Sequence, residues 1–119
     1  MSPETRDPAY LWDMLEAARS VRRYTEGLSL EPYLKDEKTR SAVERQLEIL
    51  GEAARHVSPT FQQAHPEIPW QRIMAQRNVL AHEYGEIDHF IIWKVVVTHI
   101  PALIEALQPL IPPLPPGMP

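Results

Sequence analysis

Apolar residues recur at three- and four-residue steps in several stretches of the chain, a spacing that predicts amphipathic helices. The first stretch runs from an Asp7-Pro8 start to a stop at Gly27 and has apolar residues at Leu11, Met14, Leu15, Ala18 and Val21. The second runs from about residue 36 to residue 57, with Val43, Leu47, Leu50, Ala54 and Val57 in the same register.

Two further main helices are expected in the second half of the chain. One should begin near Pro69 and run into the segment QRNVLAHEYG, residues 76–85. The other should begin after Asp88 and end near Leu110, with a bend at Pro101. A short helix over residues 59–65, capped by Ser58, would connect the second and third main helices.

The predicted fold class is all-α, because no segment shows the two-residue period of a strand. Four main helices and a short one, joined by short connections, indicate an antiparallel up-down helical bundle. Most of the thirteen prolines lie at the edges of these segments, and six of them fall within residues 109–119. We therefore expect a single domain over residues 1–111 and an extended proline-rich tail over residues 112–119.

Composition and charge narrow the class of protein. Hydrophobic residues make up 44% and charged residues 24% of the 119 residues, as in ordinary globular domains, and there is no cysteine. The N-terminus lacks the apolar run of a signal peptide, and the longest apolar clusters, which Lys94 separates, fall far short of a membrane span. We expect a cytoplasmic protein without a membrane partner. The net charge of −4 favours a protein partner and leaves any RNA contact to local arginines.

A stripe of acidic residues, Glu44, Glu48 and Glu52, follows one side of the second predicted helix. Arginines three or four positions away can offset the repulsion along this stripe, as on a solvated helix face. Glu52 also follows Gly51, and a glycine inside a helix usually has a packing reason. A second interpretation is therefore that Glu52 faces another helix at a close contact.

The segment QRNVLAHEYG gathers polar residues of catalytic type. Arg77 and Tyr84 are seven positions apart and share a face, whereas Arg77 and His82 are five apart and diverge by roughly 140° on a straight helix. Either the helix ends near His82, or a second copy of the chain completes the pair across a two-fold axis. The alternative is a helix C-terminus, where a histidine is favoured by the helix dipole and Gly85 ends the helix.

Other candidate sites have weaker support. His82, Glu86 and His89 lack the spacing of a metal-binding helix and straddle a glycine, so no metal site is expected. Surface or packing roles are expected for His56, His65 and His99, and core or interface roles for the three tryptophans, Trp12, Trp70 and Trp93. No glycine-rich phosphate loop is present, so the chain itself is not expected to bind ATP as a cofactor.

The arrangement of Arg77, Asn78, His82 and Tyr84 resembles the arginine, four residues, histidine, any residue, tyrosine motif of HEPN-domain ribonucleases. The flanking segments ERQLEILGEAARHVSP, IPWQRIMAQRNVLAHEYGEID and LIEALQPLI resemble the HepT branch, the toxin half of HEPN–MNT toxin–antitoxin pairs. The likeness extends from about residue 8 to residue 111.

The resemblance implies an all-helical HEPN fold, a homodimer with both motif copies at its interface, and a metal-independent endoribonuclease, with tRNA a substrate of some relatives. It implies Arg77 and His82 as catalytic residues, with Asn78, Tyr84 and Glu52 in supporting or RNA-binding roles. It also implies a minimal nucleotidyltransferase antitoxin, as in type VII systems, that transfers AMP from ATP to Tyr84.

The residue types fit this chemistry. Histidine can remove a proton from a ribose 2′-hydroxyl or protonate the leaving oxygen, and two His82 copies could divide these roles. Arg77 offers a permanently charged fork for phosphate oxygens, and Asn78 could orient His82. The alternative function is a non-catalytic helical subunit that scaffolds the nucleotidyltransferase, which the net charge of −4 and the acidic stripe favour.

Overall fold

The computed structural model describes the backbone of residues 3–80 and 87–112, and the side chains of residues 6–76 and 87–112. Its described residues form helices and connecting turns, with no strand among them, which confirms the all-helical prediction. The elements in chain order are α1 (Pro3–Thr25), α2 (Leu30–Lys35), α3 (Glu37–His56), α4 (Pro59–Ala64), α5 (Trp70–Leu80), α6 (His89–Lys94), the π-helical η1 (Val95–His99), α7 (Ile100–Leu107) and the 3₁₀ turn η2 (Gln108–Leu110).

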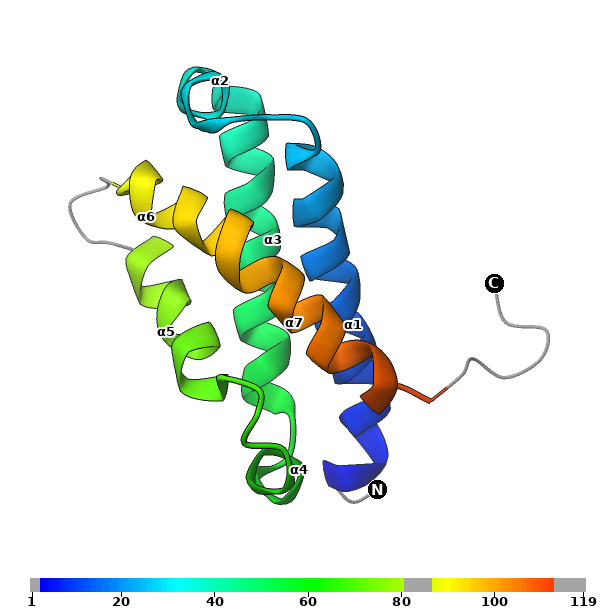
Figure 1. Cartoon of the computed structure of the whole chain (residues 1–119). Coiled ribbons are helices and arrows are strands. Elements are labelled where there is room, and N and C mark those ends of the chain that lie inside the picture. Colours follow the sequence, from blue (N-terminus) through cyan, green and yellow to red (C-terminus); the bar gives the residue numbers. More distant parts are fainter. Residues whose placement is uncertain (1–2, 81–86, 113–119) are drawn as a thin grey trace.

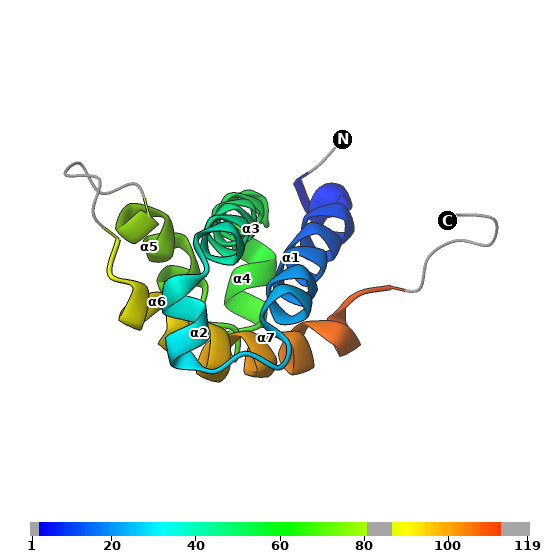
Figure 2. The same cartoon turned by 90° about the horizontal axis from the view of Figure 1, so that it is seen from above.

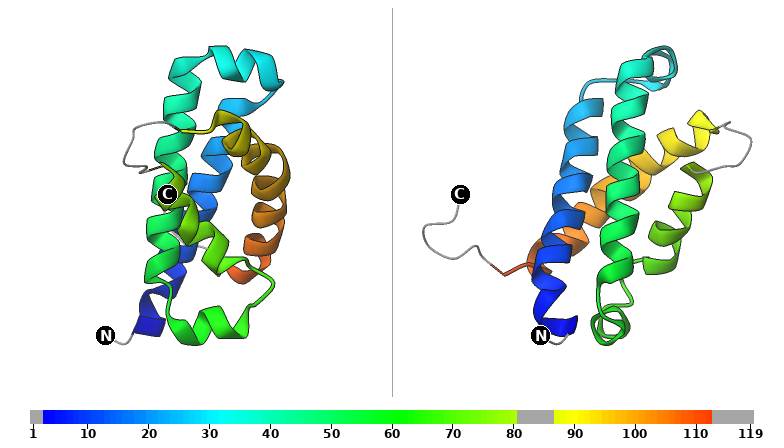
Figure 3. Two further views of the ribbon diagram at one scale, coloured as in Figure 1. Left: turned by 90° about the vertical axis from the view of Figure 1, so that its left-hand side faces the viewer. Right: turned by 180° about the vertical axis from the view of Figure 1, so that it is seen from behind.

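The helices form two layers. In the first, α1, α3 and α5 lie side by side with neighbours running in opposite directions, and α3 is in the middle (Figure 1). In the second, the continuous run α6–η1–α7 crosses the other three diagonally on one face (Figure 2). The short helices α2 and α4 lie at opposite ends of α3 (Figure 3). The fourth main helix thus crosses the layer instead of continuing the up-down order, which lets its wide apolar face cover the first layer.

The core lies between these layers and follows the predicted register. Every apolar position predicted for the first two main helices is buried, from Leu11 and Val21 in α1 to Val43, Leu47 and Val57 at α3. The crossing helix contributes seven more buried side chains: Ile92, Val95, Val96, Ile100, Leu103, Ile104 and Leu107. The helical period therefore identified the core-facing side of each of these helices.

Short polar side chains cap three helices. Asp36 accepts hydrogen bonds from the Thr39 amide at 3.0 Å and the Thr39 hydroxyl at 2.7 Å, at the start of α3. Ser58 caps α4, as predicted, with its hydroxyl accepting from the Phe61 amide at 3.2 Å. Asp88 accepts from the first amides of α6. Each cap satisfies backbone donors that have no partner inside their own helix.

One prediction for the first part of the chain is wrong, and one short helix was not predicted. Asp7-Pro8 does not start the first helix, because α1 begins at Pro3 and contains Pro8. The Asp7 carboxylate is instead 4% exposed and accepts hydrogen bonds from the Ser58 amide at 2.8 Å and the Ser58 hydroxyl at 2.6 Å. The helix that was not predicted is α2, which has six residues and a fully buried Tyr33 ring. A helix this short carries too little periodicity to be recognised in the sequence.

A π turn interrupts the crossing helix just before Pro101. Proline has no amide hydrogen and its ring crowds the carbonyl four residues earlier, so a regular α-helix is disturbed at the predicted place. The run His89–Leu110 has 22 residues and is long and apolar enough to cross a membrane by length and composition alone. Its buried side chains, from Ile92 to Leu107, pack in the core, as they do in the core helix of a globular domain.

Replacing Asp7 by alanine should lower the free energy of unfolding by about 2–3 kcal/mol, because the buried Ser58 donors lose a charged acceptor. Asp13→Ala, on an exposed position of the same helix, is the matched control and should change it by less than about 0.5 kcal/mol. Urea denaturation followed by circular dichroism measures both. Equal stability of the two variants would show that the Asp7–Ser58 contact does not stabilise the fold.

Candidate functional site

The helix that carries the first half of the polar motif, α5, is fixed at its start by a buried tryptophan. Trp70 is 6% exposed, and its indole Nε1 donates to the carbonyl oxygen of His65 at 2.9 Å. Phe61 of α4 packs edge-on to the same ring. Ile73, one turn later, is buried in the core. The predicted start of this helix near Pro69 is confirmed. These contacts fix the direction of α5 and therefore the position of its last turn.

The motif residues lie at and beyond the last described turn of α5. Arg77 and Asn78 belong to that turn, whose backbone is helical, but their side chains lie outside the described part of the chain. His82 and Tyr84 lie in residues 81–86, which the structure does not describe. The predicted divergence of Arg77 and His82, and its completion by a second subunit, therefore stay predictions.

Gln76, immediately before Arg77, is a polar residue that the sequence analysis did not single out. Its side chain is buried, and its Oε1 has no hydrogen-bond partner among the described residues. It lies near Leu50 of α3 and His99 of η1. Burial lowers the pKa of His99, and the positive charges of Arg72 and Lys94 lower it further. A buried amide among apolar neighbours has no signal in the sequence, because glutamine is usually exposed.

Glu52 lies on α3 at the side that faces α1. It is half-buried and lines a cavity of about 330 Å³ together with Tyr10 and Asp13 of α1. Its Oε1 lies 3.0 Å from Nε2 of His56, one turn further along α3, and the His56 ring stacks on Tyr10 at 5.2 Å between centroids. The interpretation that Glu52 faces a neighbouring helix agrees with this placement, whereas its proposed supporting role at the motif stays a prediction.

The acidic stripe divides into different environments along α3. Glu48 is paired with Arg45 at 3.3 Å on the surface, as expected for a solvated face. Glu44 is instead half-buried beside His89, the first residue of α6. Burial raises the pKa of Glu44, and the nearby His89 and Arg40 oppose that rise. The stripe is therefore a solvated face only in part.

Arg40 and His89 connect α3 to the start of α6, just beyond the undescribed segment. Arg40 Nη1 lies 2.7 Å from His89 Nε2, although the two residues are 49 positions apart. A guanidinium can only donate, so Nε2 must accept and the imidazole carries its hydrogen on Nδ1. That Nδ1 faces the Glu44 carboxylate at 3.6 Å. The contact holds the chain in a fixed place as it emerges from the motif segment.

No pattern in the sequence points to this Arg40–His89 contact: Arg40 lies four positions before Glu44 and was expected only to offset the acidic stripe, and His89 was considered only as a metal ligand. His82 and Glu86, the other members of that metal candidate, lie outside the described residues. No group of three potential metal ligands occurs among the residues that are described. His89 instead accepts a hydrogen bond from Arg40, which a lone pair engaged with a metal could not do.

The remaining histidines and tryptophans have the packing and surface roles expected of them. His65 pairs with Glu67 at 2.9 Å and lies against the Phe61 ring. Trp93 packs against Tyr33 with ring centroids 4.9 Å apart. Trp12 is half-buried, and the guanidinium carbon of Arg19 lies over its ring, 5.9 Å from the ring centroid.

Comparison with known proteins shows the family to which the chain belongs. The family model for "Ribonuclease HepT-like" proteins matches residues 14–110. A Thermococcus cleftensis protein named "Probable ribonuclease HepT" is 40% identical over 94 residues, which cover 79% of this chain and 86% of the relative. A Methanocaldococcus jannaschii protein, named as a candidate RNase, is 36% identical over 100 residues, 84% of this chain and 92% of its own.

A third relative, also named as a candidate RNase, comes from Caldanaerobacter subterraneus and is 32% identical over 99 residues, 83% of this chain and 88% of its own. No solved structure matches the chain significantly. The matched region includes α3, α5, the motif and the crossing helix. The chain belongs to the HepT-like ribonuclease family.

The buried Tyr33 lies near Glu44 and Arg40, and it predicts that the stability of the fold depends on pH in the alkaline range. Burial raises its pKa to about 12, Glu44 adds to the rise, and Arg40 opposes it. The unfolded phenol titrates near 10, so the folded state holds its proton more tightly and the protein should lose stability as the pH rises from about 10 to about 12. Tyr33→Phe should remove this part of the alkaline loss. At neutral pH it should cost little, because Oη has no hydrogen-bond partner among the described residues.

Urea midpoints measured at about pH 7, 10 and 11.5 would test this dependence, with Tyr24→Phe, on an exposed position, as the matched control. An unchanged alkaline loss in Tyr33→Phe would contradict the expectation.

Proposed function

We propose that this protein is a metal-independent endoribonuclease that acts as the toxin of a toxin–antitoxin pair. One observation carries the proposal: Arg77, Asn78, His82 and Tyr84 stand at the spacing of the ribonuclease motif in a chain of the HepT-like family. The names of the relatives support RNA as the substrate. Some ribonucleases of this type act on tRNA, which makes tRNA the first RNA to test.

In the proposed reaction, one His82 removes the proton of a ribose 2′-hydroxyl and the 2′-oxygen attacks the adjacent phosphorus. The bond from phosphorus to the 5′-oxygen breaks, and the second His82 protonates that oxygen. The products are a 2′,3′-cyclic phosphate and a 5′-hydroxyl end. Arg77 stabilises the charge on the phosphoryl oxygens, and Asn78 orients His82 or holds the phosphate.

The described helices that precede and follow residues 81–86 support the proposal that this segment carries part of the site. Before this segment, α5 is fixed by Trp70 and Ile73. After it, Asp88 caps α6, and Arg40 binds His89. A catalytic group must be held near its productive geometry, so a segment that begins and ends on packed helices suits the proposed role.

A homodimer completes the proposed site, because Arg77 and His82 of one straight helix would diverge. Two large apolar side chains at the start of α6 support a contact surface beside the motif. Phe90 is 62% exposed and Ile91 is 50% exposed, both within seven residues of Tyr84. An apolar pair at such a position is typical of a protein contact surface.

The proposed antitoxin is a nucleotidyltransferase that uses ATP and releases pyrophosphate as it joins AMP to the Tyr84 hydroxyl. The added phosphate and nucleoside would bring bulk and negative charge to the place that RNA must occupy. Glu52, on the side of α3 toward α1, is the remaining member of the proposed supporting set.

His82→Ala and Arg77→Ala should each reduce RNA cleavage more than about 100-fold, because each removes a group that acts on the reacting phosphodiester. His65→Ala and Arg72→Ala are the matched controls and should cut RNA at the wild-type rate. The assay uses unmodified tRNA with EDTA present and identifies the new 5′-hydroxyl ends. Undiminished cleavage by a folded His82→Ala dimer would refute the proposal. Protein without AMP that never cuts RNA, yet stimulates the nucleotidyltransferase, would favour the scaffold function.

Co-expression with the proposed nucleotidyltransferase antitoxin should add the mass of one or more AMP groups to the chain. The modified residue should be Tyr84. Tyr84→Phe should remove the modification, because it lacks the accepting hydroxyl, while the exposed control Tyr24→Phe should retain it. Intact-mass and peptide spectrometry measure both. AMP found on another residue, or unchanged RNA cleavage by the modified protein, would contradict the role of Tyr84.

A further inference from the structure

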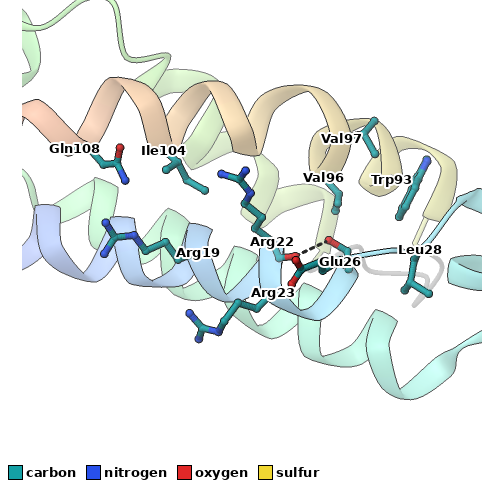
Figure 4. Close-up of a pocket in the computed structure, with 11 residues that line it drawn as sticks. Arg19, Arg22, Arg23, Glu26, Leu28, Trp93, Val96, Val97, Ile104 and Gln108 are labelled. Carbon is teal, nitrogen blue, oxygen red and sulfur yellow. Dashed lines mark hydrogen bonds between the residues drawn. The ribbon is translucent and has the colours of Figure 1, made fainter.

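A groove of about 520 Å³ lies between the last turns of α1 and the crossing helix, and the described residues that line it lie outside the motif segment (Figure 4). One wall carries three arginines of α1, Arg19, Arg22 and Arg23. The facing wall is apolar and comes from the crossing helix, with Trp93, Val96, Val97 and Ile104. Glu26 and Gln108 also line the groove, which combines a net positive charge on the α1 side with a largely apolar surface on the crossing helix.

Two of the three arginines on the α1 side of the groove are free of ion pairs with the described residues and could bind an anionic ligand. Arg19 lies 3.4 Å from Glu16, but Arg22 and Arg23 form no ion pair with any described residue. The charged residues that line the groove are three arginines and one acidic residue, Glu26, a net charge of +2 within a chain of net charge −4. The end of α1 is thus a locally basic region on an acidic protein, which favours an anionic ligand there.

The helix dipole explains only part of this arrangement. Cations are favoured in the last turn of a helix, which accounts for the presence of Arg22 and Arg23. It does not account for the apolar wall opposite, where Val97 stays 51% exposed. In Figure 4 the Arg22 side chain reaches toward that wall, while Arg23 points away from it along the rim. Arg23 also donates to the Ser20 hydroxyl at 2.9 Å.

We propose that this groove binds a single-stranded segment of the RNA substrate outside the cleavage site, an inference that rests on the proposed function. Phosphates would lie along Arg22 and Arg23, and a base would lie against the exposed Val97. Grooves that bind single strands commonly combine cations with flat apolar or aromatic surfaces, and the volume suits one or two nucleotides. The apolar wall belongs to the helical run that begins at His89, which follows the motif segment in the chain.

RNA fits the groove better than an acidic helix of a partner protein. A docked helix needs an apolar stripe wide enough to exclude water, whereas here the exposed apolar surface is confined to one wall. Guanidinium groups also match phosphate oxygens in a planar, two-pronged way. The acidic-partner alternative is an outcome of the test below.

The test measures binding of a fluorescein-labelled 2′-O-methyl oligouridine of about 12 nucleotides, which cannot be cleaved through a 2′-hydroxyl, to the full-length protein. Arg22→Gln/Arg23→Gln should weaken binding at least about 10-fold and lower the slope of log K against log salt by about 1.4, the value for two lost phosphate contacts on a single strand. Arg45→Gln/Arg55→Gln removes the same charge from exposed positions of α3 and should change binding less than about 2-fold.

A second variant, Val97→Asp, places a negative charge on the apolar wall without altering the arginines, and it too should weaken binding. Circular dichroism melting confirms that each variant folds. Equal weakening by both arginine pairs would show that only overall charge matters and would overturn the proposal. Unchanged RNA binding in Arg22→Gln/Arg23→Gln, with loss of binding to the nucleotidyltransferase, would overturn it in favour of an acidic partner.

Cleavage kinetics separate this inference from the proposed function. If the groove holds RNA, Arg22→Gln/Arg23→Gln should raise KM for RNA and leave kcat near the wild-type value, because the reacting groups are untouched. A wild-type protein that never cleaves RNA would refute the nuclease function alone, since oligouridine binding is measured independently of cleavage.

Discussion

The packing of α3 against its neighbours is the constraint on which the rest of the structure depends. Helix α3 has α1 on one side, α5 on the other and the crossing helix over one face, so its side chains must satisfy three contacts at once. Val43, Leu47 and Leu50 fill the core, which leaves Glu52 toward α1 and Arg40 toward α6. The α3 register therefore determines where the residues around the motif can lie.

Much of the fold could be predicted because it depends on local patterns. The period of apolar residues located α1 and α3, and Ser58 and Asp88 identified helix starts from their side-chain chemistry. The position of Pro8 could not be predicted in this way. Asp7 looked like a helix start, but it lies inside a helix that begins at Pro3, and its carboxylate binds Ser58, 51 positions away. Helix α2 was missed because six residues show no reliable period.

The same distinction between local patterns and tertiary contacts applies to the candidate site. The spacing of Arg77 and His82 is a local feature and was found in the sequence. The hydrogen bond between Arg40 and His89 joins distant residues, and no pattern within either segment reveals it. The basic groove was missed for the same reason: Arg22 is unremarkable at the end of a helix until Val97 is placed opposite it. Groups that act together across helices require the tertiary structure, whereas groups spaced along one helix do not.

The π turn before Pro101 holds one more residue than an α turn would. The buried positions record this, because Ile92, Val95 and Val96 are followed by Ile100, Leu103, Ile104 and Leu107, one position later than an unbroken α-helical period would place them. The extra residue is therefore taken up within the turn, and both parts of the crossing helix turn their apolar sides to the same core. Removing one residue from Val95–His99 would allow a regular α-helix with the buried side of α7 still toward α1, whereas removing one from α7 itself would rotate the residues beyond it by about 100°.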